Sequence, residues 1–388
     1  MKYFLLGAFL LSTIACKAQN SQQSKKTVKT EDSNLSGEHD SQINSKDLSI
    51  KYFSKNSELD FKVEAAYKKM NSQEKAAQMI MVASAEALGL KYYLKVKPQV
   101  SQKIAANILL LKGSKSEFIR QQKELSQNKI ADLKPLFACD CEPTLLHNKF
   151  PGEPKMLSTS SLKTSEDVIA SVDSINSLMD KMGIVINFAP ILDIAANKAI
   201  INKRAFSNDA ENIKKLSATF IKATQEDGKA ATVKHFPGHG AVIGDTHKQS
   251  VSINGKMTEL STFESIIKND HPILVMVGHI AVKNNPDGYN TEDGRPATTS
   301  KKLMTDLLRN KIGFRGIITT DAMNMQASKN FPNADWEAAK AGADLILMPL
   351  DANSLNKKIA AEIEKGSDLG KQFEASVKRI IRLKLLTQ

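Results

Sequence analysis

The sequence predicts an α/β protein built as one (β/α)8 barrel of the TIM type, preceded by a signal peptide and a flexible tether. From about Glu58 onward, short apolar runs rich in β-branched residues alternate with amphipathic stretches, which favours parallel strands connected by helices. The alternation repeats about eight times over roughly 330 residues, as a barrel of this type requires. No glycine-rich phosphate-binding loop follows an early run, which disfavours a doubly wound sheet, the competing fold.

Eight apolar runs are the expected strands, namely Met79–Ala83, Asn107–Leu111, Pro135–Asp140, Ile184–Ala189, Ala231–His235, Ile273–Val277, Ile317–Asp321 and Asp344–Met348. Amphipathic stretches predict helices at Ser165–Lys181, Asp209–Glu226, Lys301–Asn310 and Ala334–Ala341. Gly342 follows the last of these and is a residue type that commonly ends a helix. Because the active sites of such barrels lie on the loops after the strands, the residues that follow these runs are the candidate functional residues.

The first residues are typical of an export signal. Lys2 precedes an apolar run over Tyr3–Leu11, and small residues lead up to Cys16. The run is too short for a membrane-spanning helix. The segment before Cys16 resembles a bacterial lipobox, with Thr13 where Leu is usual. This resemblance implies a signal peptide over residues 1–15 and lipidation of Cys16, with cleavage by ordinary signal peptidase as the alternative.

Residues 16–57 are expected to form a flexible polar tether. They are rich in Ser, Gln, Asn, Lys and Asp and show almost no apolar periodicity, so they have no core of their own. The barrel is then expected over residues 58–388, where no apolar run approaches 18 residues. Together with the signal, these features predict an exported protein that is periplasmic or anchored to the outer membrane as a lipoprotein.

The composition is that of a globular protein, with 41% hydrophobic and 25% charged residues. Lys and Arg number 54 against 42 Asp and Glu, which gives a formal net charge of +12. Such a surplus suits nucleic acid, an anionic membrane surface or an acidic polymer. The lysines are spread along the chain, and no Arg-rich stripe with interleaved aromatic residues is present. Nucleic-acid binding is therefore not expected.

Three cysteines are too few for a disulfide scaffold. Cys139 and Cys141 are separated by one residue, so a strand would place both thiols on one face. That spacing is unfavourable for a disulfide. The two residues are expected to be small apolar side chains of the core.

The richest segment for chemistry is residues 234–247, which begins where an expected strand ends and contains three of the seven histidines. Asp245 and His247 can meet in a tight turn, where the carboxylate would orient the ring and raise its basicity, as a general acid/base needs. A metal site is a second interpretation, although the spacing matches no standard zinc pattern. In the third interpretation the histidines have only a structural role, and their ring nitrogens donate hydrogen bonds to backbone carbonyls. The metal interpretation uses His235, His239, Asp245 and His247.

Three charged residues follow other expected strands. Asp321 closes the run Ile317–Asp321, so that in a barrel it points into the catalytic mouth; by itself it is equally typical of a helix N-cap. Asp140 occupies the analogous position on an earlier strand. Arg204 lies on a long loop after another strand and is either a site residue or a solvated surface cation.

These residues carry a family resemblance. Lys-His-Phe-Pro-Gly-His-Gly at residues 234–240, followed by Asp245-Thr246-His247, closely resembles the signature of glycoside hydrolase family 3 in its β-N-acetylglucosaminidase (NagZ-type) branch. Residues 187–193 and 313–321 are similar to the regions of the family's fourth and seventh strands, in the right order. The resemblance extends from about residue 64 to residue 350.

The resemblance implies a role for each matched residue. Asp321 aligns with the catalytic nucleophile and His247 with the general acid/base, assisted by Asp245. Residues aligned with sugar-binding positions are Asp140, Arg204, Lys234 and His235. The implied reaction is a two-step displacement with retention through a glycosyl-aspartate, without cofactor or metal. A histidine with a pKa near 6.5 suits the proton transfer at neutral pH.

The implied activity is exo-acting hydrolysis of terminal β-linked N-acetylglucosamine, expected to come from peptidoglycan fragments. Cys141, Glu142 and Pro143 stand where the family usually has an acidic residue and two glycines, Thr320 replaces Ser, and Ala322 replaces an Asp that is frequent in the branch. Losing paired glycines removes backbone freedom beside the sugar. The alternatives are therefore a β-glucosidase or glycoside phosphorylase of the same family, and a catalytically silent sugar-binding lipoprotein.

Overall fold

The structure is a computed structural model that describes residues 45–85, 90–198, 201–242, 244–246 and 248–388. The predicted signal peptide, the lipidation site Cys16 and the predicted acid/base His247 lie outside the described residues. Among the described helices, none combines the length and apolar character needed to cross a bilayer.

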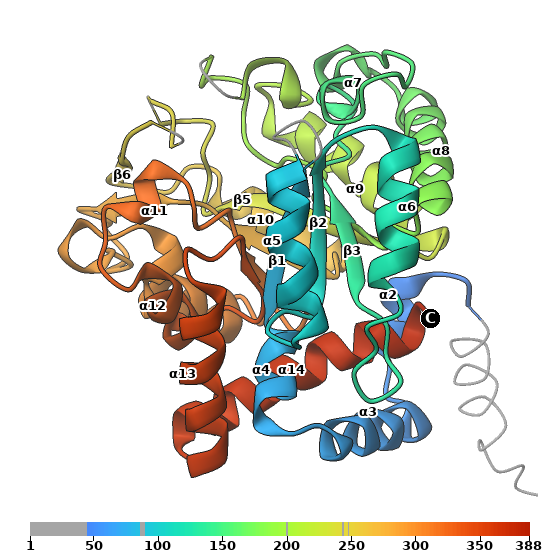
Figure 1. The fold of residues 1–388 in the computed structure, drawn as a ribbon. Coiled ribbons are helices and arrows are strands. Elements are labelled where there is room, and N and C mark those ends of the chain that lie inside the picture. The colour runs from blue at the N-terminus through green and yellow to red at the C-terminus, as the bar shows by residue number, and fades with distance from the viewer. Residues whose placement is uncertain (1–44, 86–89, 199–200, 243, 247) are drawn as a thin grey trace, which may run out of the picture. The chain divides into compact units, whose positions relative to one another are not determined.

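Eight parallel strands in the described part of the chain form a nearly closed barrel in the order β10-β1-β2-β3-β4-β5-β7-β9 (Figure 1). Their bounds are β1 Ile80–Ala85, β2 Asn107–Lys112, β3 Leu136–Cys139, β4 Ile186–Asn187, β5 Ala230–Phe236, β7 Leu274–Val277, β9 Ile317–Thr320 and β10 Ile346–Leu347. A parallel bridge between Thr319 and Leu345 joins the two ends of the sheet. All eight predicted runs coincide with these strands, so the predicted fold class is confirmed.

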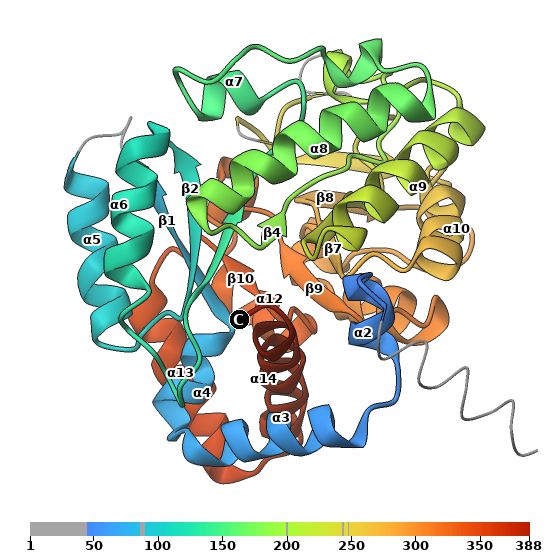
Figure 2. The same cartoon turned by 90° about the vertical axis from the view of Figure 1, so that its right-hand side faces the viewer.

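Helices surround the strands (Figure 2). Their bounds are α2 Leu48–Phe53, α3 Ser57–Lys69, α4 Ser72–Gln78, α5 Leu90–Ser101, α6 Lys115–Leu125, α7 Leu146–Lys149, α8 Ser165–Met182, α9 Ala210–Glu226, α10 Leu260–Asp270, α11 Gln326–Lys329, α12 Ala334–Ala341, α13 Ala352–Lys365 and α14 Asp368–Leu386. A π-helix spans Lys302–Lys311. The four predicted helices are thereby confirmed, one of them in π form. Gly342 ends α12 in the left-handed conformation, as predicted.

The strands bury both faces, which is why they appear in the sequence as continuous apolar runs. In β1, Met81 and Ala83 belong to the cluster inside the barrel, whereas Ile80 and Val82 pack in the cluster between strands and helices. Helix α8 supplies that outer cluster through Val168, Val172, Ile175 and other residues at helical spacing. The two clusters fix the strands and so fix the loops at their carboxyl ends.

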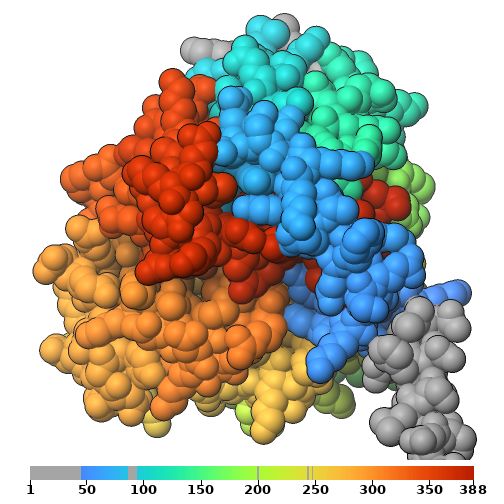
Figure 3. All heavy atoms as spheres, turned by 90° about the horizontal axis from the view of Figure 1, so that it is seen from below, coloured from blue at the N-terminus to red at the C-terminus, as the bar shows by residue number. Residues whose placement is uncertain are grey.

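Helix α2 contradicts the prediction that the tether extends to residue 57. Leu48 and Tyr52 are buried with Ile380 and Leu383 of α14 in the inner cluster. The Tyr52 hydroxyl donates to the Arg379 carbonyl, and Arg382 donates to the Tyr52 carbonyl over 2.6 Å. Seen from below, residues near both ends of the described chain lie side by side over this end of the barrel (Figure 3). The early segment is ordered because it caps the barrel.

A small sheet was also missed by the sequence prediction. Strands β6 (Val251–Asn254) and β8 (Ile280–Lys283) pair in parallel outside the barrel. In β6 buried and exposed residues alternate over only four positions. So short a pattern does not stand out from a loop.

Candidate active site

The predicted sugar-binding residues and Asp321 line one cavity of about 520 Å³ at the carboxyl ends of the strands. Asp140 directly follows β3, Lys234 and His235 lie in β5, and Asp321 directly follows β9. Parallel strands of a barrel end at one rim, which brings these distant residues together. Two other cavities of similar volume, one beside α8 and one beside α10, are lined by none of the predicted residues.

Ion pairs connect the charged groups at the rim. The Lys234 ammonium lies 3.0 Å from Asp140 Oδ1 and 2.5 Å from Glu142 Oε1. Lys149 donates to the other Asp140 oxygen over 3.0 Å. Arg204 donates to both Glu142 oxygens, at 2.9 Å and 2.8 Å. The loop after β3 therefore supplies two carboxylates, and three cations from other segments hold them.

These contacts fix the charge of the network. Burial raises the pKa of Asp140, but Lys149 and Lys234 outweigh it and hold that pKa well below its usual range. Burial likewise raises the pKa of Glu142, yet Arg204 and Lys234 lower it to about 2. Burial lowers the pKa of Lys234, but its two carboxylate partners outweigh burial, so that the pKa lies above its ordinary value. At neutral pH the rim thus presents ionised groups suited to hydrogen-bonding hydroxyls.

Asp321 has the ionisation state that a nucleophile needs. Burial raises its pKa, but electrostatic interactions with His235 and His279, together with the hydrogen bond from the Ala322 amide, lower it below the ordinary value. Its Oδ1 accepts from the Ala322 N–H over 2.8 Å, and its own N–H donates to the Val277 carbonyl. The alternative of a helix N-cap is wrong, because the next helix, α11, begins at Gln326 with Met325 as its N-cap, and Asp321 lines the cavity.

His235 is oriented by Asp193, a residue that the sequence prediction did not assign to the site. His235 Nδ1 donates to Asp193 Oδ2 over 2.6 Å, and the His239 amide donates to Asp193 Oδ1 over 2.7 Å. Burial raises the pKa of Asp193, but the electrostatic interaction and hydrogen bond with His235 outweigh burial and lower that pKa. The hydrogen bond to Asp193 holds Nδ1 and fixes the orientation of the His235 ring at the cavity.

His279 supports the backbone beside Asp321. Its Nε2 donates to the Ala322 carbonyl over 2.9 Å, and its Nδ1 lies 2.8 Å from the Thr298 hydroxyl. Because a carbonyl only accepts, Nε2 carries a proton. His279 is buried and follows β7. It therefore holds Ala322, the residue whose amide also donates to Asp321.

The loop that carries Asp245 is tied to the rim at Thr246. The Thr246 hydroxyl lies 3.3 Å from His239 Nε2, and its carbonyl accepts from the Ala327 amide of α11. Asp245 is half-buried. Because His247 is outside the described residues, its pairing with Asp245 stays a prediction. No three His, Cys, Asp or Glu side chains within the described ranges are grouped to hold a metal ion.

Glu259, just before α10, joins two rim loops. Its Oε1 accepts from the Ile194 amide over 2.8 Å and from the Gly240 amide over 3.1 Å, and its Oε2 accepts from the Ala241 amide. Gly240 is required there, since a Cβ would lie 2.1 Å from the Ile194 carbonyl oxygen. Burial and the nearby Asp193 charge raise the pKa of Glu259 to about 8.

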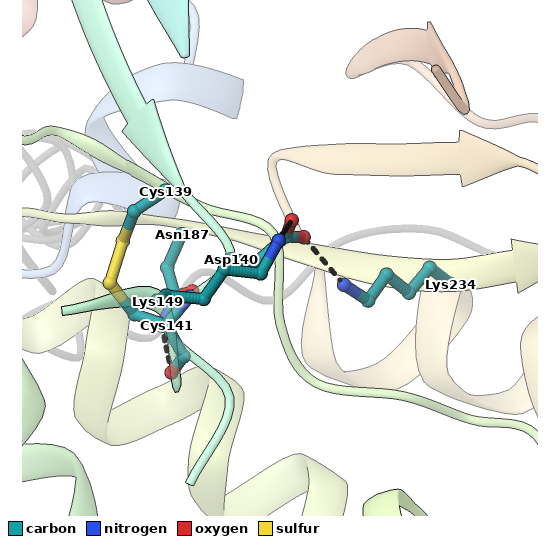
Figure 4. The surroundings of a disulfide bond; sticks show 6 residues. All are labelled: Cys139, Asp140, Cys141, Lys149, Asn187 and Lys234. Atoms are coloured by element: carbon teal, nitrogen blue, oxygen red, sulfur yellow. Dashed lines mark hydrogen bonds and ion pairs between the residues drawn. A yellow bond between two sulfur atoms is a disulfide. The ribbon is translucent and has the colours of Figure 1, made fainter. Parts of the chain in front are cut away.

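The cysteine prediction was wrong, because Cys139 and Cys141 form a disulfide (Figure 4). Two residues of a regular strand span about 6.7 Å, whereas these Cα atoms are 5.4 Å apart. Strand β3 ends at Cys139 and the chain begins to turn. The turn brings the Cα separation within the range that disulfides bridge.

The sequence model of the glycosyl hydrolase family 3 N-terminal domain matches residues 72–383. The chain belongs to this family. Beta-hexosaminidase A of Pseudoalteromonas piscicida is 32% identical over 235 residues, covering 54% of this chain and 39% of that protein. A beta-hexosaminidase of Actinobacillus succinogenes is 32% identical over 178 residues, covering 44% and 49%. The chain thus spans about half or less of these relatives.

Solved family 3 structures share the fold. A β-N-acetylglucosaminidase from Paenibacillus sp. has a TM-score of 0.72 at 25% identity, covering 82% of this chain and 63% of that one. A β-N-acetylhexosaminidase from Beutenbergia cavernae gives 0.70 at 21% identity, covering 81% and 98%. A β-glucoside phosphorylase bound to 2FGlc gives 0.77 at 22%, covering 88% and 63%. The latter two likenesses concern the fold alone.

The family 3 resemblance read from the sequence is therefore confirmed, and the structure brings five predicted site residues into one cavity. These are Asp140, Arg204, Lys234, His235 and Asp321. The sequence prediction missed the residues that hold these side chains or the loops around them, namely Glu142, Lys149, Asp193, Glu259 and His279. Two of these could have been found from the sequence, because Glu142 and Asp193 lie a few residues after the ends of expected strands, where site residues are expected.

Proposed function

We propose that this family 3 protein is an exo-acting, retaining β-glycosidase that hydrolyses terminal β-linked N-acetylglucosamine. The observation that carries the proposal is the ionised Asp321 at the end of β9, in a cavity rimmed by paired carboxylates and cations. Further support comes from relatives named beta-hexosaminidase and from the likeness to a β-N-acetylglucosaminidase structure.

In the proposed mechanism Asp321 attacks the anomeric carbon and forms a covalent glycosyl-aspartate. His247, assisted by Asp245, protonates the leaving oxygen and then deprotonates the water that releases the sugar. Two inversions give net retention. Asp140, Lys234, His235 and Arg204 are proposed to bind sugar hydroxyls, and the fixed charges of Asp140 and Lys234 suit that task.

The proposed biological setting is the cell envelope. The predicted signal peptide and the lipobox at Cys16 support export and lipid anchoring, and the net charge of +12 suits an anionic wall polymer. Peptidoglycan fragments are the proposed source of the sugar. Replacing Cys16 with Ala would move the protein from the membrane fraction to the soluble fraction, whereas unchanged fractionation would contradict the anchor.

The first experiment follows release of chromophore from aryl β-N-acetylglucosaminide and from the corresponding glucoside. It uses protein beginning at Ser21, together with Asp321→Ala and the surface control Asp306→Ala. We expect turnover of the acetylated sugar that is lost only in Asp321→Ala. Turnover of the glucoside alone would change the substrate class. Sugar phosphate as the product in phosphate buffer would indicate phosphorolysis. Absence of turnover would favour a sugar-binding lipoprotein.

Azide separates the two proposed catalytic roles. If Asp321 is the nucleophile, azide can occupy the space left in Asp321→Ala and attack the sugar once, giving the α-glycosyl azide. If His247 is the acid/base, azide in His247→Ala attacks the covalent intermediate and gives the β-glycosyl azide. The anomeric configuration of each product is read by NMR. The opposite assignment, or no azide product from either variant, would contradict these roles.

A further inference from the structure

The disulfide between Cys139 and Cys141 encloses Asp140, a residue of the proposed sugar site. Figure 4 shows Asp140 between the two cysteines, with its carboxylate directed toward Lys234. Both cysteines are wholly buried. Nothing in the proposed mechanism uses this bond.

Both ends of the three-residue segment are also hydrogen-bonded to the end of β4 and the residue that follows it. The Cys139 carbonyl accepts from the Phe188 amide over 2.8 Å. The Asn187 side chain holds Cys141 on both sides: its Oδ1 accepts from the Cys141 amide at 3.1 Å, and its Nδ2 donates to the Cys141 carbonyl at 3.4 Å. The disulfide links the two ends of the segment to each other. Asp140 is thus the middle residue of a small ring with little backbone freedom.

The segment carries like charges that repel. The Asp140 and Glu142 carboxylates both contact the Lys234 ammonium, and their mutual repulsion, although weaker than the attraction of the surrounding cations, favours a backbone that moves the two carboxylates apart. A turn with free φ and ψ angles at Asp140 would relieve the repulsion by rotation. The disulfide ring prevents that rotation.

We infer that the Cys139–Cys141 disulfide is a positioning element for sugar binding, which fixes the Asp140 carboxylate against Lys149 and Lys234. The inference rests on the proposed function, since it takes the cavity beside Asp140 as the sugar site. Asp140 is distinct from Asp321, where the bond is broken. Loss of the disulfide therefore raises KM and leaves kcat nearly unchanged.

A thiol count tests the bond itself and needs no activity. Protein beginning at Ser21 contains only these two cysteines. Unfolded in denaturant without reductant, it will show no reactive thiols, and two after treatment with a dithiol. The reagent supplies two electrons and two protons, the S–S bond breaks to two thiols, and the reagent becomes a cyclic disulfide. Two thiols before reduction would overturn the inference.

Variants test the positioning role. The double variant Cys139→Ser/Cys141→Ser should raise KM for the aryl glycoside about tenfold, with kcat within about twofold. In an Asp140→Asn background the same two changes should have almost no further effect, because they act through Asp140. Equal effects in both backgrounds, or a loss confined to kcat, would overturn the inference. Cys16→Ser in the full chain is the control.

Two further measurements keep the result interpretable. Thermal unfolding of the double variant shows whether it is folded at the assay temperature, and Cys139→Ala/Cys141→Ala is the alternative should the serines unfold it. Calorimetric binding of N-acetylglucosamine gives the same tenfold comparison without turnover. Binding by a protein that has no turnover would refute the hydrolase proposal and still test the disulfide. Binding unchanged in the double variant would refute the positioning role.

Discussion

Two buried lysines at opposite ends of the barrel have opposite pKa shifts. Lys234 at the carboxyl-end rim lies against the carboxylates of Asp140 and Glu142, which raise its pKa above the ordinary value despite burial. Lys384 in α14 donates to the Gln78 side-chain oxygen over 2.7 Å and to the Ala106 carbonyl over 3.1 Å. Burial lowers its pKa to about 7.

The difference shows that the partner, rather than burial, decides the charge of such a group. Both side chains are almost completely inaccessible to solvent. A carboxylate partner compensates the ammonium for its lost hydration, whereas neutral oxygens do so only in part. The rim therefore keeps fixed charges for binding, and the other end contains a charge that opposes folding at neutral pH.

Removing the rim lysine should have the largest effect. Lys234→Met leaves Asp140 and Glu142 buried without their shared cation, so the free energy of unfolding should fall by about 3–5 kcal/mol and kcat/KM by roughly a hundredfold or more. Urea denaturation and steady-state kinetics measure both. Lys149→Met, which loses one carboxylate contact at a more exposed position, should cost less. A stable and active Lys234→Met would break the comparison.

Removing the other lysine should stabilise the protein. Native Lys384 loses its proton near pH 7, whereas in the unfolded chain it does so near 10.5. The unfolded chain binds more protons between these values, so wild-type stability rises with pH across this window. Lys384→Met should be more stable by about 1–3 kcal/mol near pH 7, with the gain declining toward pH 10. Lys357→Met on the surface is the control. A gain independent of pH would contradict the prediction.

Giving Lys384 an anion should make it resemble Lys234. Gln78→Glu places a carboxylate where Lys384 now contacts an amide oxygen, so the pKa of Lys384 should rise toward or above its ordinary value. The slope of unfolding free energy against pH between 7 and 10 should flatten, while stability at pH 7 changes by about 1 kcal/mol. Denaturation curves across this range measure the slope. An unchanged slope would show that burial alone controls Lys384.

The smallest change in stability at a single pH is expected at Glu259, a buried carboxylate that accepts hydrogen bonds from backbone amides. Its pKa is about 8 in the folded protein against 4.5 ordinarily, so the folded state binds more protons and its stabilising contribution declines as pH rises through this range. Glu259→Gln should abolish that decline and change stability at pH 5 by about 1 kcal/mol or less. Urea midpoints at pH 5 and pH 8 test this, with exposed Glu264→Gln as the control. A decline that persists would contradict the assignment.

Sequence patterns predicted the barrel because each strand is a local apolar run with polar residues after it. They missed α2, a six-residue helix whose burial depends on α14 more than 300 residues later. They also missed the disulfide, since a turn at the end of β3 shortened a distance that a regular strand would keep long. Each failure concerns a contact or a bend that adjacent residues do not encode.

The same division holds at the site. By itself the sequence determined the strand-end positions of Asp140 and Asp321 and the family signature around Lys234, because these depend on periodicity and on a contiguous motif. Only the tertiary structure decided that Glu142 meets Arg204, that Asp193 orients His235, and that Lys384 lacks the kind of partner Lys234 has. Charge and pKa depend on desolvation and on groups within a few ångströms, which segments far apart in the chain supply.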